Sequence, residues 1–286
     1  MKKMKLLPPV LAILCAGMFV GYQAWDRINT DNKAPEITVS TETIQLSTSA
    51  PKSALLQDIT ALDNRDGDVS DTLLVESIKA LDSDGTMEVT FAAFDRSGNV
   101  AKGSRTVRYT DYKPPRFTLN NAMVYPFNSN FDLLNAIDAT DTLDGSLRYR
   151  IRAMSLDNNA INTLGDHEVE FRVTNSLGDT VRLTLPVTVY SRSSSALTVT
   201  LKDYLIYLPR NSSFDAHSYL KEVSYGNETF RADELSDEFS IRVSDNVNTA
   251  VPGVYSVDYE ITYATQNRDG TEYITIPTRL IVVVED

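Results

Sequence analysis

Four aspartates in the first third of the chain have the residue type and clustering of a metal site. Asp63, Asp66 and Asp68 fall in an acidic glycine turn, and Asp95 opens a second turn farther along the sequence. Calcium prefers oxygen ligands from clustered carboxylates and carbonyls. We therefore expect these four side chains to converge as a calcium site. The alternative is that Asp and Gly residues build both turns by backbone hydrogen bonding, without a metal.

Other chemistry-bearing residues are sparse. His167 and His217 are the only histidines, and their separation is not that of zinc ligands. Neither histidine is coupled by spacing to a serine or threonine nucleophile. No motif singles out a pair of carboxylates for glycoside hydrolysis, although such a pair could be present among the 39 acidic residues. We expect no enzyme activity, no catalytic residues and no cofactor apart from calcium.

The composition restricts the class of partner and the redox chemistry. The formal net charge is −12, which disfavours nucleic acid because nucleic acid binds basic surfaces. Cys15 is the only cysteine, so no intrachain disulfide forms. Exported proteins are permitted disulfides but do not require them. We interpret the chain as a bacterial exported protein.

The N-terminal 25 residues predict the location of the chain. Lys2, Lys3 and Lys5 precede an uncharged stretch over residues 6–25, which is just long enough to cross ~30 Å of hydrocarbon. We expect a cytoplasmic tip and a single-pass signal-anchor in residues 1–25, with the remaining domains extracytoplasmic at the bacterial cell surface. The alternatives are a cleaved signal peptide and a lipoprotein modified at Cys15.

A short alternating pattern occurs three times and predicts the core of the fold. It covers residues 85–91, 165–171 and 253–259. In each copy a glycine is followed by a large side chain, a valine and an aromatic residue at alternate positions. Alternation of this kind places the three side chains on one face of a β-strand.

The three copies define a repeat that divides the chain. Residues 26–34 are a polar linker, and we place the domains at residues 35–112, 113–192 and 196–286. Each has roughly seven short strands separated by Asx and Gly turns, which is typical of a β-sandwich. One of these strands is expected over Leu147 to Ile151. The third domain diverges most, because it lacks the acidic turn.

These motifs resemble the tandem immunoglobulin-like domains of bacterial surface proteins. The resemblance is carried by Asp63, Asp66, Gly67 and Asp68, and by Asp95-Arg96-Ser97-Gly98-Asn99. It implies an all-β fold of three tandem immunoglobulin-like β-sandwiches after the N-terminal helix. In such domains a corner tyrosine ties a core strand to a neighbouring loop. Tyr255 resembles that tyrosine, and His167 stands at the same place in the second domain.

The predicted fold does not identify a ligand, because this scaffold serves many functions. A structural role is the more direct expectation. We expect a membrane-anchored structural or adhesive protein, whose first two domains form a stalk for the divergent third domain. We expect that domain to bind a protein or glycan partner, because it departs most from the repeat and lies farthest from the membrane. Its tyrosines offer sugar-stacking platforms, and the alternative is that they serve the core and the sheet surface. The alternative is an accessory subunit of a cell-envelope membrane complex, without adhesive activity.

Overall fold

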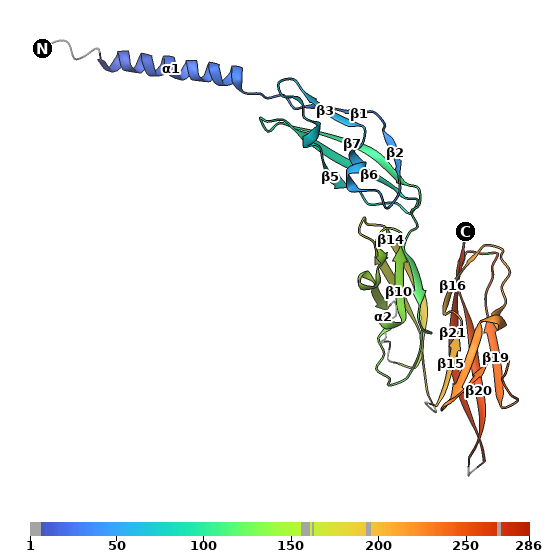
Figure 1. The fold of residues 1–286 in the computed structure, drawn as a ribbon. Coiled ribbons are helices and arrows are strands. Elements are labelled where there is room, and N and C mark those ends of the chain that lie inside the picture. The colour runs from blue at the N-terminus through green and yellow to red at the C-terminus, as the bar shows by residue number, and fades with distance from the viewer. Residues whose placement is uncertain (1–6, 156–160, 162, 193–195, 268–269) are drawn as a thin grey trace. The chain divides into compact units, whose positions relative to one another are not determined.

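The computed structural model describes residues 7–155, 161, 163–192, 196–267 and 270–286. The chain divides into two compact units, Met1–Asp111 and Tyr112–Asp286. After an N-terminal helix, the described residues form six β-sheets, which pair as three sandwiches (Figure 1). The predicted all-β class of paired sheets is therefore confirmed.

The N-terminal helix α1 spans Leu7–Asn29. Among the described residues, no helix combines the length and the apolar character required to cross a membrane. The predicted single-pass localisation is therefore wrong.

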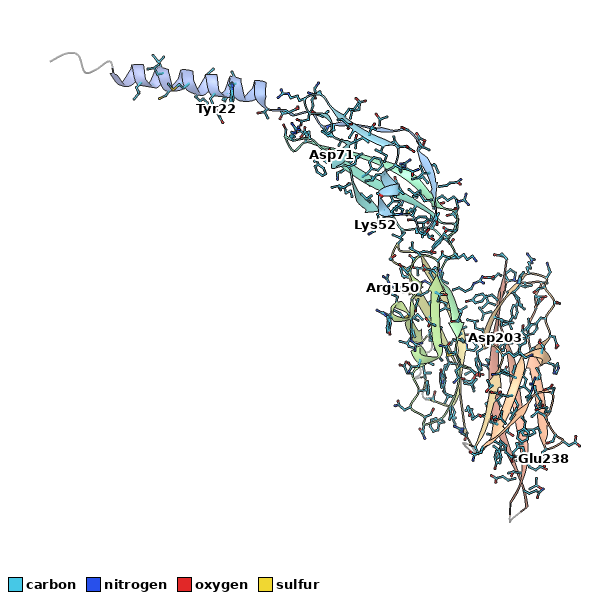
Figure 2. All side chains as sticks on the ribbon, in the orientation of Figure 1. Tyr22, Lys52, Asp71, Arg150, Asp203 and Glu238 are labelled. Atoms are coloured by element: carbon cyan, nitrogen blue, oxygen red, sulfur yellow. The ribbon has the colours of Figure 1, made fainter. Side chains whose placement is uncertain are left out.

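The first unit contains one sandwich, made of a three-stranded sheet β1-β3-β4 and a four-stranded sheet β2-β7-β6-β5. Charged side chains such as Lys52 and Asp71 are exposed on its outside (Figure 2). Its strands and 3-10 helices are β1 (Glu36–Val39), β2 (Thr43–Leu46), η1 (Lys52–Leu56), β3 (Ile59–Asp63), β4 (Gly67–Asp68), η2 (Ser70–Thr72), β5 (Leu74–Ile78), β6 (Thr86–Phe94) and β7 (Val100–Tyr109).

The second unit begins with a sandwich of the same design, in which sheet β11-β10-β8 faces sheet β12-β13-β14-β9. The prediction of a strand over residues 147–151 is wrong. Leu147 and Ile151 are buried, but a 3-10 turn between them brings both to the core, and the strand starts at Arg152. The elements are β8 (Arg116–Leu119), β9 (Val124–Pro126), α2 (Leu133–Ala136), β10 (Ile137–Asp141), β11 (Gly145–Ser146), η3 (Arg148–Arg150), β12 (Arg152–Ser155), β13 (Gly165–Thr174) and β14 (Thr180–Tyr190).

The third sandwich completes the second unit, with sheets β15-β17-β18 and β16-β21-β20-β19. Its last two strands are the longest in the structure and form a hairpin. The elements are β15 (Leu197–Leu201), β16 (Leu205–Pro209), η4 (Ala216–Tyr219), β17 (Leu220–Tyr225), β18 (Glu228–Arg231), β19 (Phe239–Asp245), β20 (Gly253–Asn267) and β21 (Gly270–Glu285).

All three sandwiches share one topology, which identifies them as repeats. In each, the second strand leaves the first sheet and pairs in parallel with the last strand of the repeat. The parallel pairs are β2 with β7, β9 with β14, and β16 with β21. All other strand pairs among the described residues are antiparallel.

The thrice-repeated pattern forms the central strand of each core, as predicted. Met87, Val89 and Phe91 on β6 are all buried and face the same side of the strand. Burial of each such side chain contributes roughly 1.5–3 kcal/mol. The equivalent buried side chains in the other two repeats are His167, Val169, Phe171, Val257 and Tyr259.

The corner positions make the backbone contacts expected of them. The Tyr255 hydroxyl donates to the carbonyl oxygen of Val251 at 2.9 Å. His167 Nε2 lies 2.9 Å from the carbonyl oxygen of Thr163, at the same separation in sequence. Tyr255 and His167 therefore each tie a core strand to the loop before it, which is the role of a corner tyrosine in immunoglobulin domains.

Within the second unit, the two sandwiches share a core. Leu205 of β16 and Ile281 of β21 lie in the same buried cluster as Phe117 and Phe171 of the second sandwich. The Tyr207 hydroxyl donates to the carbonyl oxygen of Phe117 at 3.1 Å. The two sandwiches consequently lie side by side (Figure 1).

Charged contacts surround this shared core. The Arg116 guanidinium lies over the Tyr207 ring, 4.3 Å from its centroid, and forms an ion pair with Glu285. Arg279, whose side chain is only 11% exposed, donates from Nη1 to the Thr188 hydroxyl at 2.8 Å. The second and third sandwiches therefore form one packed body.

A substitution at Gly103 would test the packing of the central strand in the first sandwich. Gly103 pairs with Phe91 across β6 and β7, and a Cβ at this position would lie 2.6 Å from Cε2 of the fully buried Phe91 ring. Gly103→Ala should therefore lower the free energy of unfolding by about 1–3 kcal/mol. Faster hydrogen exchange in peptides covering β6 and β7 would report it. Ser104→Ala, at the neighbouring exposed position, is the control, and equal exchange in the two variants would contradict the packing argument.

Candidate functional site

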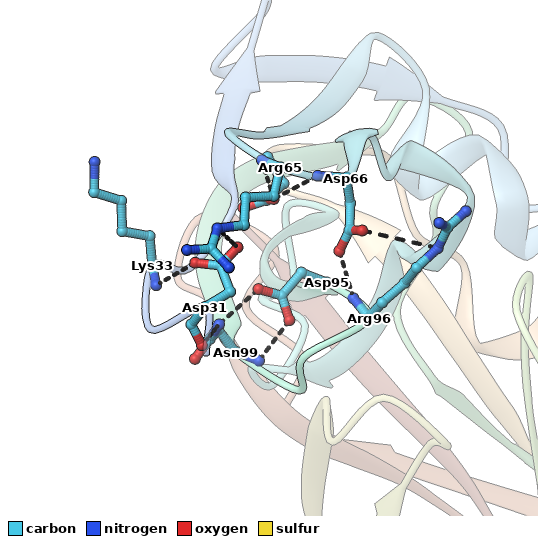
Figure 3. A network of polar contacts seen from close by, with 8 residues as sticks. Asp31, Lys33, Arg65, Asp66, Asp95, Arg96 and Asn99 are labelled. Carbon is cyan, nitrogen blue, oxygen red and sulfur yellow. Dashed lines mark hydrogen bonds and ion pairs between the residues drawn. The ribbon is translucent and has the colours of Figure 1, made fainter. Parts of the chain in front are cut away.

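Three buried carboxylates meet at one end of the first sandwich. Asp63 ends β3, Asp95 follows β6, and Asp31 lies between α1 and β1. They are 7–8% exposed, and one carboxylate oxygen from each lies within 4.8 Å of the other two. We call these three residues the acidic triad; Asp31 and Asp95 are labelled in Figure 3. The triad includes two of the four predicted calcium ligands.

The other two predicted ligands lie outside the triad. Asp66 accepts a hydrogen bond from the backbone N–H of Arg96 at 2.9 Å, which ties the acidic turn to the turn after β6. Asp68 accepts from the backbone N–H of Ser70 at 3.0 Å. The Ser70 hydroxyl and N–H lower the pKa of Asp68. Both carboxylates thus organise turns.

Asp63 is held by its own turn. Its Oδ1 accepts from the backbone N–H groups of Asp66 at 2.9 Å and Arg65 at 2.8 Å. These two donors lower the pKa of Asp63, so the side chain is charged at neutral pH. Its Oδ2 is buried and accepts no hydrogen bond. One oxygen of a charged, buried carboxylate is therefore left without a hydrogen bond.

Asp31 and Asp95 have partners from the surrounding loops. Asp95 accepts from the backbone N–H and the side-chain amide of Asn99, both at 2.7 Å. Asp31 Oδ1 accepts from the backbone N–H of Lys33 at 3.1 Å. Asp31 Oδ2 lies 3.7 Å from Arg65 Nε, an ion pair without a hydrogen bond. Figure 3 shows these contacts converging on one side of the turns.

The charge balance of this end of the sandwich is negative. The triad contributes three carboxylates, and Arg65 contributes one guanidinium on a side chain that is 44% exposed. A net charge of −2 is therefore concentrated where burial already disfavours charge. Like charges at such separations repel strongly unless a cation lies among them. A divalent cation would neutralise the group and supply the contact that Asp63 Oδ2 lacks.

The second sandwich has the same turns with different side chains. Asp141 ends β10 as Asp63 ends β3, and Asn175 follows β13 as Asp95 follows β6. The Asn175 amide donates to Asp141 Oδ2 at 3.0 Å and to the Tyr112 hydroxyl at 2.8 Å. The Tyr112 hydroxyl donates to Asp179 at 2.6 Å. Hydrogen bonds thus satisfy Asp141 and Asp179 at this end of the second sandwich.

The two ends differ by an exchange of aspartate and asparagine. The first sandwich has Asp95 with Asn99, and the second has Asn175 with Asp179, in turns closed by equivalent backbone hydrogen bonds. The amide of Asn175 reaches Asp141, whereas a carboxylate stands there in the first sandwich. Burial and the bond to Asp179 raise the pKa of Tyr112, which keeps the phenol protonated as a donor.

Asp31 could not be recognised from residue spacing, because it lies in a stretch that reads as a polar linker. The signal that points to it is topological. β1 pairs antiparallel with β3, and Glu36 lies opposite Leu62. Residues before β1 and residues after β3 must therefore lie at the same end of the sheet. An aspartate shortly before the first strand is thus placed beside the acidic turn.

Comparisons with known proteins assign no family to the chain. No protein-family model and no curated protein matches it. Extracellular cadherin domains 1–5 of Protocadherin Gamma B2 match over 90% of this chain, with 11% identity and a TM-score of 0.21, and the chain spans 61% of that protein. Human CDH23 EC21-23 matches with 13% identity and a TM-score of 0.22, covering 88% of this chain and 100% of that one.

A structure containing an enzyme also matches. It holds the M60 catalytic domain with the CBM51-1 and CBM51-2 domains of Clostridium perfringens ZmpB, at 11% identity and a TM-score of 0.20. The match covers 88% of this chain and 31% of that one. At these TM-scores the activity of none of these proteins transfers to this chain. The resemblance to bacterial immunoglobulin-like domains stays a prediction.

Tyr112 tests the hydrogen-bond network of the second sandwich. Tyr112→Phe removes the donor to the buried Asp179 and the acceptor for the Asn175 amide. We expect the free energy of unfolding of the second unit to fall by about 1–3 kcal/mol, the cost of leaving a buried polar group unsatisfied. Urea denaturation measures it. Tyr149→Phe is the control, since that side chain is 92% exposed, and an equal effect at both tyrosines would refute the network's role.

Proposed function

We propose that this chain is a non-catalytic structural or adhesive protein that recognises a protein or glycan through its third sandwich. The observation that carries the proposal is the shared core of the second and third sandwiches. Leu205 and Ile281 pack into the core that contains Phe117, so the third sandwich is held on a packed support. A rigid support lowers the entropy lost when an exposed surface binds a partner.

The third sandwich offers aromatic side chains for recognition. The rings of Tyr225 and Tyr263 lie 4.5 Å apart, and Phe239 stacks on Tyr263 at 4.6 Å. Phe230 extends this row from β18, with its ring 5.1 Å from that of Phe239. Tyr273 is 69% exposed on the long β20–β21 hairpin. Exposed and half-buried aromatic side chains dominate binding energy at protein interfaces.

Absence of catalysis and a structural use of calcium belong to the same proposal. His167 is committed to the backbone of Thr163, so it is not placed as a general base. Calcium would act at the first sandwich as a structural ion, because the acidic triad is buried among turns.

Removing the third sandwich is a poor test, since it would expose the shared core. Substituting Tyr273 is sharper. Tyr273→Ala should weaken binding to the partner at least about tenfold, as expected of an aromatic hot spot. The intact chain would be screened on a glycan array and against cell-envelope proteins, and each hit measured with both variants.

The matched control is Tyr149→Ala, an exposed tyrosine on the second sandwich. Binding that survives Tyr273→Ala but falls with Tyr149→Ala would move recognition to the second sandwich and contradict the proposal. Hydrolysis of an arrayed glycan, instead of its retention, would contradict the non-catalytic role.

A further inference from the structure

We propose that the acidic triad is a calcium site that fastens the segment before β1 to the first sandwich. The ligands are Asp31, Asp63 and Asp95, one from each of three separate segments of the chain. Bound calcium would therefore join the segment before β1 to the turns that follow β3 and β6. The site belongs to the first unit and does not depend on any ligand of the third sandwich.

The first argument is the unsatisfied oxygen of Asp63. This carboxylate is 8% exposed and its Oδ2 accepts no hydrogen bond, while one of its oxygens lies within 4.8 Å of a carboxylate oxygen of Asp31 and of Asp95. Buried charges in folded proteins are paired or coordinate metals, because an uncompensated one is costly. The remaining oxygen of the same side chain is already saturated by two backbone N–H groups. A cation held by the triad would supply the missing partner of Oδ2.

The second argument is geometric. Calcium binds oxygen at roughly 2.3–2.6 Å, so two ligands of one ion lie no more than about 5 Å apart. One oxygen from each triad residue already satisfies that limit, at 4.8 Å or less. The turns position all three through backbone hydrogen bonds at Lys33, Arg65 and Asn99. Calcium also accepts irregular geometry with additional waters, whereas magnesium demands a near-ideal octahedron.

The third argument is charge. The single guanidinium of Arg65, whose Nε lies 3.7 Å from Asp31 Oδ2, balances one of the three carboxylate charges of the triad. The residual charge of −2 matches one calcium ion. The Arg65 side chain, 44% exposed, reaches the triad from the acidic turn.

The equivalent end of the second sandwich is not expected to bind calcium. There Asn175 and Tyr112 fill the equivalent end with hydrogen-bond donors, and Asp141 Oδ2 has the partner that Asp63 Oδ2 lacks. A neutral amide and a phenol therefore do in the second sandwich what calcium would do in the first. The repeat thus contains its own metal-free counterpart.

Calcium titration of the intact, chelator-treated chain tests the proposal. Isothermal titration calorimetry should detect one site per chain, and hydrogen exchange in residues 30–34 should slow when calcium is added. Asp63→Asn and Asp31→Asn should each weaken calcium binding at least about tenfold, because affinity follows the number of charged ligands. The asparagine variants keep the side-chain volume and reduce repulsion, so folding is retained; circular dichroism checks it.

Matched controls lie next to the site and in the second sandwich. Asp68→Asn changes an acidic residue of the same turn that is outside the triad, and Asp141→Asn changes the counterpart of Asp63. Both variants should bind calcium as the unsubstituted chain does. No heat with millimolar calcium, or equal binding by Asp63→Asn and the unsubstituted chain, would overturn the proposal. Slowed exchange elsewhere but not in residues 30–34 would overturn the fastening role.

Discussion

Burial of one alternating strand is the constraint on which each sandwich depends. With no cysteine after residue 15, no disulfide links the two sheets of any repeat. The link is made by apolar packing around Val89, Val169 and Val257, which are completely buried. Position 103 favours glycine because the Phe91 ring occupies the volume that a Cβ would need. Sheets, turns and corners are arranged around these strands.

Much of this architecture is predictable from sequence because it depends on local alternation. The period of two, the turn residues and the corner positions all act over short distances. The segment around Leu147 shows the limit. Leu147 and Ile151 are both buried because a 3-10 turn lies between them. Two apolar residues four positions apart are equally expected on one face of an alternating strand. Periodicity alone cannot distinguish the two arrangements over so few residues.

The candidate site was only half predictable, for a different reason. Asp63 and Asp95 stand in recognisable turns, but their convergence with Asp31 depends on strand pairing between β1 and β3. Asp66 has the same local signal as Asp63, yet it bonds to the backbone of the neighbouring turn. The shared core of the second and third sandwiches is also invisible in sequence. Leu205 and Ile281 read as ordinary strand residues, and nothing local indicates that they pack against a neighbouring repeat.

The parallel pairing of β2 with β7, and of its counterparts, affects how each sandwich would respond to mechanical tension. The second strand lies near the start of its repeat and the last strand lies at the end, so their hydrogen bonds lie between the points where the chain enters and leaves. Tension along the chain would load all of these hydrogen bonds in shear at the same time. They would have to break together and not one after another. The paired register covers four residue pairs in the first sandwich, three in the second and five in the third. The third sandwich, with the longest parallel register, should therefore resist opening under tension most strongly, and the second least.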